Sequence, residues 1–318
     1  MTIILLGPQR LHPTLATVVS DQGIEGPIAA VTAGWQERED EDHDLRDHLG
    51  GRTRNLRLYR RAETVFREDP ELFTAYRARQ DRLKGLRELY RLRLSYAMEA
   101  ARALQTRTTK SLYLKGEIEA AIEEVRRLDR HHLELVSEIH AEFERDFQPA
   151  QRPSVERQRR EIATELSECA ALAIAGGHVA ALLNRLRLFN LVGLLESQTI
   201  LAWSAGAMVL GSQIVVFHDS PPQGAGHAEV FESGLGVFSD LLPLPHAERR
   251  LLLSDLARVA LMSRRSTPLS CIPLDEGAEL IRSEGRWAPE SSINRLTDEG
   301  TVLAVKDPWP VQGGTVSI

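Results

Sequence analysis

Residues 201–210 read Leu-Ala-Trp-Ser-Ala-Gly-Ala-Met-Val-Leu, a short apolar run interrupted by one serine between small residues. The run before the serine is typical of a buried strand, and the residues after it favour a helix. A serine at so sharp a turn has a strained backbone and needs small neighbours, which Ala202, Ala205 and Gly206 provide. We therefore predict a nucleophile elbow that exposes the hydroxyl of Ser204 beside free N–H groups of a helix. The alternative is an ordinary helix-capping serine.

Three neighbouring motifs favour the elbow. Upstream, the apolar run 171–175 leads into Gly176-Gly177-His178, and a glycine pair lets the backbone approach a ligand closely. Downstream, His246 follows a predicted turn and Glu276 follows a second apolar run. With Ser204, these residues supply a nucleophile, a base and an acid that orients the base, each at the edge of a predicted strand.

These pieces together resemble the dipeptidase E and cyanophycinase family of serine peptidases, which has the class I glutamine amidotransferase-like fold. The N-terminal strand 3–7 and the stretch 29–35 also fit the start of that family, so the resemblance covers roughly residues 1–50 and 155–305. The matching motifs keep the family's order: Ala175-Gly176-Gly177-His178, Ala202-Trp203-Ser204-Ala205-Gly206-Ala207, an aspartate-containing loop at 218–224, Pro245-His246, and Leu274-Asp275-Glu276-Gly277.

The resemblance implies a serine peptidase or amidase that transfers an acyl group to water. Ser204 would attack the carbonyl, His246 would move the proton, and Glu276 would hold the imidazole, although Asp219 could also do so. The N–H groups of Gly177 and Ala205 are the expected oxyanion hole. The residues expected to bind substrate are Gly176, His178, Asp219 and Arg249.

The chain also departs from the family pattern. Ala202 replaces the first glycine of the elbow, while Ala175, His178 and Val179 stand where the family has glycine, asparagine and threonine. The wall that faces the substrate therefore differs. This difference leaves open a second function, a binding or scaffold protein with little or no turnover. A glutamine amidotransferase is disfavoured, because that chemistry needs cysteine at the elbow.

Composition agrees with a globular enzyme. The 318 residues are 42% hydrophobic, and a net charge of −6 disfavours a nucleic-acid binder. We expect no membrane span, no secretory segment, no cofactor and no metal site; His218, Asp219, His227 and Glu229 lack the spacing of a metal motif. Only two cysteines, Cys169 and Cys271, favour reduced thiols and a cytoplasmic protein.

Residues 56–148 form a separate pattern with heptad spacing on two successive helices. Residues 52–115 hold 17 Lys and Arg against 7 Asp and Glu, whereas residues 116–147 hold 4 against 10. A basic helix followed by an acidic one predicts an antiparallel hairpin whose arms attract each other. The predicted seam residues are Leu86, Tyr90, Leu94, Ala97, Ala101, Leu104, Ile118, Ile122, Val125, Leu128, His132, Leu135, Ile139 and Phe143.

The hairpin is expected to be a packing or dimerisation element, with Leu89, Leu92 and Tyr96 as apolar surface beyond the seam. Alternatives are a docking arm for another protein, a lid over the active site, or a nucleic-acid contact by the basic arm. His132 is expected to be an interior histidine rather than a ligand. If the hairpin is an assembly element, a protein that lacks residues 60–146 should still fold.

We predict an α/β fold with a mostly parallel central sheet and helices on both faces. The predicted strands are 3–6, 28–32, 171–175 and 199–203, with the hairpin inserted after the second. The catalytic domain would then be discontinuous, with residues 1–55 and 149–318 flanking the insertion at 56–148. The acidic run from Glu37 to Asp44 is expected to be a solvated loop, and the alternative is that it dips into the site. Residues 298–300 are expected to form a tight turn into a last strand.

Overall fold

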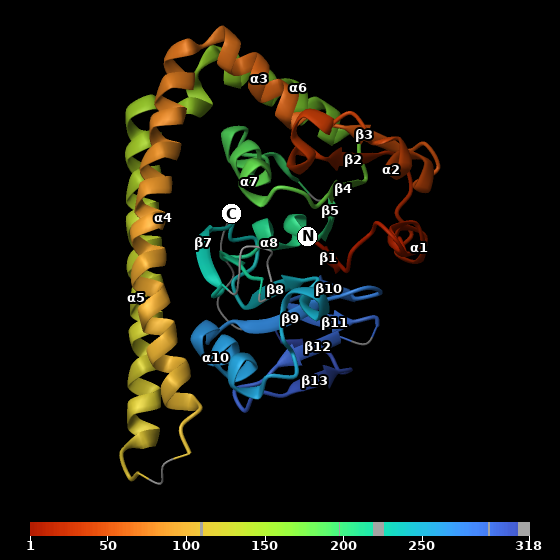
Figure 1. Ribbon diagram of the computed structural model, residues 1–318. Coiled ribbons are helices and arrows are strands. Elements are labelled where there is room, and N and C mark those ends of the chain that lie inside the picture. The colour runs from red at the N-terminus through yellow and green to blue at the C-terminus, as the bar shows by residue number, and fades with distance from the viewer. Residues whose placement is uncertain (109–110, 197, 219–225, 292, 311–318) are drawn as a thin grey trace.

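The structure is a computed structural model that describes residues 1–108, 111–196, 198–218, 226–291 and 293–310. Its centre is an eight-stranded sheet in the order β14-β11-β10-β1-β5-β4-β2-β3 (Figure 1). Strands β1, β5, β4, β2 and β3 run parallel, and β10, β11 and β14 extend one edge in the antiparallel sense. The strand bounds are β1 (Ile3–Leu6), β2 (Ile28–Val31), β3 (Thr53–Asn55), β4 (Ala171–Ile174), β5 (Thr199–Trp203), β10 (Glu279–Ser283), β11 (Arg286–Pro289) and β14 (Trp309–Pro310).

This architecture confirms the predicted α/β class with a mostly parallel sheet. The four predicted strands are β1, β2, β4 and β5, while β3 was not predicted because it has only three residues, all polar. The helical insertion therefore follows the third strand rather than the second. The described residues also form three smaller sheets: β6 (Gln213–Val216) with β7 (Glu229–Ser233), β8 (Leu241–Pro245) with β9 (Ser270–Leu274), and β12 (Ile293–Leu296) with β13 (Val302–Val305). The predicted turn at 298–300 joins β12 to β13, but β14 follows, so β13 is not the last strand.

Helices cover both faces of the large sheet because alternate strand residues point to opposite sides. Ile3 and Leu5 pack with α3, α6, α7 and α8 on one face, and Ile4 and Leu6 pack with α1 and α2 on the other. The helix bounds are α1 (Leu15–Asp21), α2 (His43–His48), α3 (Leu58–Glu68), α4 (Pro70–Gln105), α5 (Leu114–Phe147), α6 (Pro153–Ser167), α7 (Val179–Leu188), α8 (Ala205–Leu210), α9 (Ala247–Arg250) and α10 (Leu256–Ser266), with 3-10 turns η1 (Ala33–Arg38), η2 (Pro149–Gln151) and η3 (Val192–Leu194).

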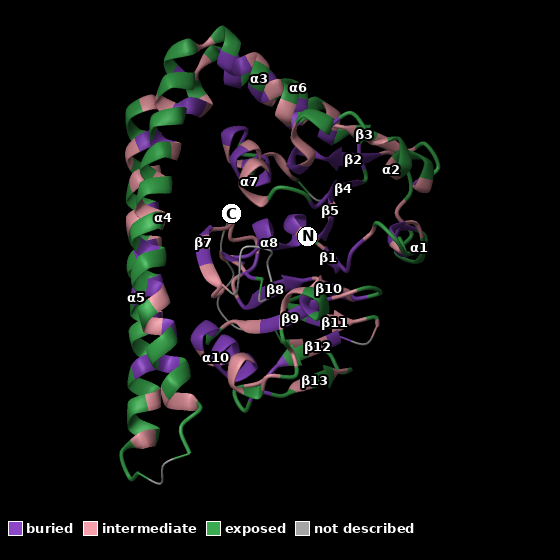
Figure 2. Cartoon of the chain, viewed as in Figure 1, coloured by how far each residue is buried: buried purple, intermediate pink, exposed green. Residues whose placement is uncertain are grey.

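The predicted hairpin is formed by α4 and α5, which lie side by side along the α/β part of the molecule (Figure 1). One ion pair between the arms, from Arg82 to Glu142 at 2.7 Å, has the predicted direction of charge. Buried and exposed residues alternate along both arms (Figure 2). His132 is buried as predicted and its ring stacks on that of Tyr90, with centroids 4.2 Å apart. Leu89, Leu92 and Tyr96 are exposed, at 65%, 59% and 68%.

One face of the hairpin packs against the α/β part of the molecule. Leu94 of α4 and Val125 of α5 share an apolar cluster with Val230 of β7, Leu242 of β8 and Leu261 of α10. Burial of apolar area is the main favourable term in folding. Removing residues 60–146 would uncover these strands and α10, which argues against the expectation that the remaining core would fold on its own.

A buried polar network joins both arms of the hairpin to α10 and β7. Arg265 of α10, whose side chain is 3% exposed, donates to Asp129 of α5 through Nε at 2.6 Å and Nη2 at 2.7 Å. Arg265 also donates to the hydroxyl of Tyr90 of α4 at 3.0 Å and to the carbonyl of Ala228 at 2.5 Å. The hydroxyl of Tyr90 donates to Asp129 at 2.7 Å and accepts from the N–H of Val230 at 3.1 Å. The network thus gives hydrogen-bond partners to both members of the buried pair of Asp129 and Arg265, and it fixes the hairpin to α10 and β7.

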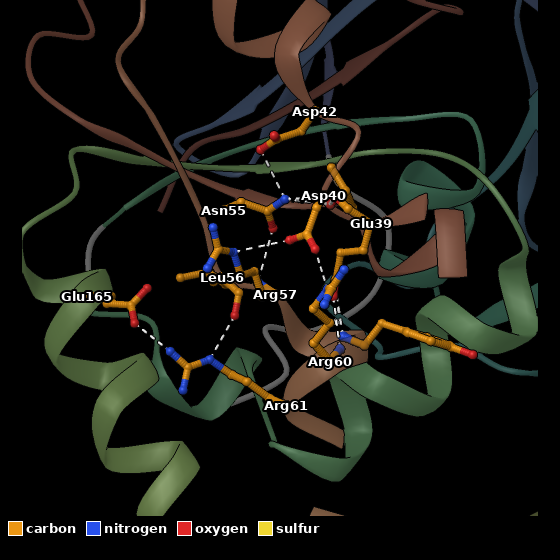
Figure 3. A network of polar contacts seen from close by, with 11 residues as sticks. Glu39, Asp40, Asp42, Asn55, Leu56, Arg57, Arg60, Arg61 and Glu165 are labelled. Carbon is orange, nitrogen blue, oxygen red and sulfur yellow. Dashed lines mark hydrogen bonds and ion pairs between the residues drawn. The ribbon is translucent and has the colours of Figure 1, made fainter. Parts of the chain in front are cut away.

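The acidic run from Glu37 to Asp44 is not simply a solvated loop. Glu39 is fully buried, and its two carboxylate oxygens accept the N–H groups of Tyr59 and Arg60 at 2.9 Å each, which caps the start of α3. Burial raises the pKa of Glu39, and these two backbone hydrogen bonds oppose the rise. Around it, Asp40 pairs with Arg57 and Arg60, and Asn55 donates to Asp42 at 3.0 Å (Figure 3). A charge run can therefore contain one buried residue that sequence alone does not distinguish.

Candidate active site

Ser204 has the backbone of a strained elbow. It lies between the end of β5 at Trp203 and the start of α8 at Ala205, with φ of 51° and ψ of −123°. Few residues other than glycine adopt such angles, and they persist only where the surroundings impose them. Gly206 shows one source of the constraint, because a Cβ there would lie 2.2 Å from the carbonyl oxygen of Ile174. The geometry is that of the predicted nucleophile elbow.

His246 lies next to Ser204 but comes from a separate pair of strands. It follows β8, which runs parallel to β9, and its own backbone is left-handed with φ of 59° and ψ of 34°. Its N–H donates to the carbonyl of Leu274 at 3.2 Å. The ring nitrogen Nε2 lies 3.1 Å from the hydroxyl oxygen of Ser204. A nucleophile and a base 42 positions apart in sequence are thus within hydrogen-bonding distance.

The surroundings of His246 favour its neutral form. Burial is the largest cause that lowers the pKa of the imidazole, and the cations of Arg250 and Arg249 lower it further. The carboxylate of Glu276 acts in the opposite direction. A neutral imidazole can accept a proton. Burial and the two arginines therefore allow His246 to act as a base at pH values below the usual histidine pKa. Arg250, which the sequence did not single out, contributes more to this lowering than Arg249.

Glu276 lies beside the site, but its hydrogen-bond partner is Arg249 and not the histidine. It follows β9, its side chain is 37% exposed, and Oε1 accepts a hydrogen bond from Arg249 Nη2 at 2.9 Å. Its other oxygen lies 3.9 Å from His12 Nε2. Within the described ranges, no hydrogen bond joins Glu276 to His246. The assignment of Glu276 as the orienting acid therefore stays a prediction.

The loop that contains Gly176 and Gly177 lies against the serine and is called the glycine wall below. A Cβ on Gly176 would lie 2.7 Å from Ser204 Cβ, and a Cβ on Gly177, where φ is 118°, would lie 2.4 Å from the carbonyl oxygen of Gly34. The N–H of His178 donates to that same carbonyl at 2.7 Å. The glycine pair is therefore required for close approach of the loop both to Ser204 and to the loop after β2. His178 itself caps α7, because its Nδ1 accepts the N–H of Ala181 at 3.2 Å.

Comparison with known proteins agrees with this geometry. The model of peptidase family S51 matches residues 127–288, just over half of the chain. The chain belongs to peptidase family S51. This confirms the resemblance seen in the sequence, and the protein is a serine-type peptidase. Among solved structures, a peptidase from an acI-B1 Actinobacterium aligns over 97% of this chain and 96% of its own, with 13% identity and a TM-score of 0.48. No curated protein matches the chain.

This S51 peptidase has a further strained residue near the site, which the sequence did not reveal. Gln36, in η1 after β2, has φ of 59° and ψ of −125°, nearly the same backbone angles as Ser204. It lies two residues after Gly34, against which Gly177 packs. Its carbonyl accepts the N–H of the buried Glu39 at 2.9 Å, so the capping residue of α3 also helps to fix this turn. No sequence motif marks the position, because the strain exists only in the folded loop.

The remaining predicted residues fall outside the described site. Asp219 lies outside the described residues, as does most of the predicted aspartate loop. Among the residues that the structure describes, no three His, Cys, Asp or Glu side chains are grouped to hold a metal ion. Both cysteines are free and buried. Over the same described ranges, none of the helices combines the length and apolarity that crossing a bilayer requires.

Proposed function

We propose that this S51 peptidase hydrolyses a small peptide or amide with Ser204 as nucleophile, His246 as general base and Glu276 as the acid that supports the histidine. The observation that carries the proposal is the 3.1 Å separation of Ser204 Oγ and His246 Nε2 at a strained strand-to-helix turn. Strain at a functional position is typical of a preorganised nucleophile. A buried capping serine would need neither the histidine nor the strained backbone.

The reaction would proceed through an acyl-enzyme. Ser204 Oγ attacks the carbonyl carbon while His246 Nε2 takes the hydroxyl proton, and the carbonyl oxygen becomes an oxyanion. The N–H groups of Gly177 and Ala205 would donate to that oxyanion. Ala205 is the first residue of α8, so its N–H has no acceptor within the helix. The imidazolium then gives its proton to the leaving amine, and a water molecule activated by the same histidine releases the acyl group.

Glu276 would stabilise the imidazolium that forms in each step. Its negative charge already raises the pKa of His246, and it follows β9, whose end lies beside the end of β8. In the structure it is engaged by Arg249, so a direct bond to the imidazole would require that ion pair to open or to be shared. Catalytic hydrogen bonds often tighten only when substrate is bound.

The substrate would bind between the glycine wall and α9. We assign Gly176 and His178 to one side of it and Arg249 to the other, with Asp219 as a further candidate. The alternative, an inactive scaffold that works through its hairpin, is disfavoured because a protein without turnover has no need to keep the serine and histidine within hydrogen-bonding distance. A strained elbow without function would also be a cost with no compensating gain.

The test is hydrolysis of a dipeptide and aminoacyl-amide panel by the wild type and by Ser204→Ala. We expect the variant to lose turnover by a factor on the order of 10⁴ to 10⁶. Ser167→Ala is the matched control, because Ser167 ends α6 at an exposed position on the opposite end of the parallel strands. Hydrolysis by Ser204→Ala at the wild-type rate would contradict the proposal.

A further inference from the structure

Asp275 is a carboxylate in the catalytic region to which the reaction described above gives no role. It follows directly after β9, and the pairing of Pro245 with Leu274 places it beside His246, the residue that follows β8. It is more enclosed than its neighbour Glu276, and burial raises the pKa of Asp275. The contacts of this half-buried carboxylate therefore indicate its role.

Those contacts are with the backbone that carries the histidine. Asp275 Oδ1 accepts the N–H of Glu248 at 3.0 Å, and the N–H of Ala247 also stabilises the charged carboxylate. These are the two residues after His246, in the first turn of α9. His246 occupies the position before this helix but its own side chain makes no capping bond. Asp275 thus supplies, from the neighbouring strand, the cap that a serine or aspartate normally supplies from within a helix.

The turn that carries Asp275 is held in place by backbone contacts. The N–H of Ala278 donates to the carbonyl of Asp275 at 3.1 Å, and the N–H of Gly7 donates to the carbonyl of Ala278 at 2.8 Å. A Cβ on Gly7 would lie 1.9 Å from the carbonyl oxygen of Asp275, so the end of β1 packs directly against this turn. The Oδ2 atom of Asp275 is buried and makes no hydrogen bond to the rest of the described structure. A half-buried carboxylate with one buried oxygen that lacks a hydrogen bond is costly, which points to a role other than stability.

The histidine needs such support. A residue other than glycine in the left-handed region costs roughly 1 kcal/mol or more and keeps that conformation only where several contacts impose it. On one side, the N–H of His246 is held by Leu274; on the other, the first turn of α9 is held by Asp275. Both contacts come from the end of β9. A displacement of the imidazole by about 1 Å would be enough to lower the rate about 10²-fold.

We propose that Asp275 is a positioning residue for His246: by capping α9 from the neighbouring strand it holds the imidazole Nε2 against Ser204. The inference rests on the proposed function, since it assigns Asp275 to the same serine and histidine. It differs from the role of Glu276, because Asp275 acts through the backbone and Glu276 through its charge near the ring.

The experiment compares Asp275→Ala with Asp275→Asn by steady-state kinetics and by the rate of labelling with a fluorophosphonate probe. The amide oxygen of asparagine can accept the same N–H, whereas alanine cannot. We expect Asp275→Ala to lower kcat and the labelling rate by about 10- to 100-fold with KM changed less than about threefold. Asp275→Asn should restore kcat to within about threefold of the wild type.

Asp255→Ala is the matched control for loss of a cap. Asp255 accepts the N–H of Arg258 at 3.1 Å at the start of α10, so its removal should lower Tm by a few degrees without changing kcat. Wild-type kcat in Asp275→Ala would overturn the inference, as would equal losses in Asp275→Ala and Asp275→Asn, which would make the charge decisive. If Ser204→Ala keeps wild-type turnover, the proposed function itself fails.

Discussion

The candidate active site and the hairpin seam each contain a histidine close to carboxylate and arginine side chains, but the hydrogen bonding of the two regions differs. At the candidate active site, Ser204 and His246 have strained backbones, and Ser204 Oγ lies 3.1 Å from His246 Nε2. At the seam, the buried Arg265 shares its donors among Asp129, Tyr90 and Ala228. A saturated network stabilises a single packing arrangement, whereas a partly satisfied and strained set of groups remains available for chemistry.

Removal of His246 should have the largest effect on the active-site side of this comparison. His246→Ala takes away the only base within hydrogen-bonding distance of Ser204 in the described structure, so turnover should fall by about 10⁴-fold or more while the fold is kept. Steady-state kinetics and a thermal melt test this. A loss smaller than tenfold would show that another group acts as the base.

Removal of Arg265 should have the largest effect on the seam side, and on stability rather than on turnover. Arg265→Ala leaves the buried Asp129 without its cation, and breaking a buried pair from one side costs about 3–5 kcal/mol. Chemical denaturation measures the change. Arg130→Ala is the control, since Arg130 pairs with Glu123 on the exposed side of α5 and should cost no more than about 1 kcal/mol. Equal losses of unfolding free energy in Arg265→Ala and Arg130→Ala would mean that the buried ion pair at the seam contributes no more to stability than the exposed pair.

The smallest predicted effect is a shift in the acid limb of the kcat/KM profile, with opposite sign in two variants. The reaction needs neutral His246, so kcat/KM should fall as pH drops through the lowered pKa, below the usual value of 6.5. Arg250→Gln removes a cation that lowers this pKa, so the acid limb should move to higher pH. Glu276→Gln removes the anion that raises it, so the limb should move to lower pH.

The control for both is Arg160→Gln, at an exposed position on α6, which should leave the pH profile unchanged. A shift of the same sign in Arg250→Gln and Glu276→Gln would contradict the electrostatic account of His246.

The motifs of the candidate active site could be recognised in the sequence because their signals are local. Small residues around Ser204, the pair Gly176-Gly177 and the strand ends before His246 and Glu276 can each be recognised within a few positions. The periodicity of apolar residues likewise predicted the strands and the hairpin. These features depend on backbone sterics and on burial, which act over short stretches of chain.

Long-range contacts were the part that sequence could not supply. The pairing of Asp129 with Arg265 joins residues 136 positions apart, and the capping of α9 by Asp275 depends on the register of β8 and β9. Glu39 looked like one acid among several until the fold placed it under α3. The same limit applies to the predicted orienting acid: Glu276 was predicted from its place at a strand end before a glycine, but its ion pair with Arg249 is visible only in three dimensions.

The central claim is that Ser204 is the activated nucleophile of this S51 peptidase. The most direct measurement is to label the wild type and His246→Ala with a fluorophosphonate probe and to locate the modified residue by mass spectrometry of the digested protein. The account predicts a single adduct on Ser204 in the wild type and labelling slowed by at least about 10³-fold without His246. An adduct on another serine, or labelling of Ser204 that does not depend on His246, would contradict it.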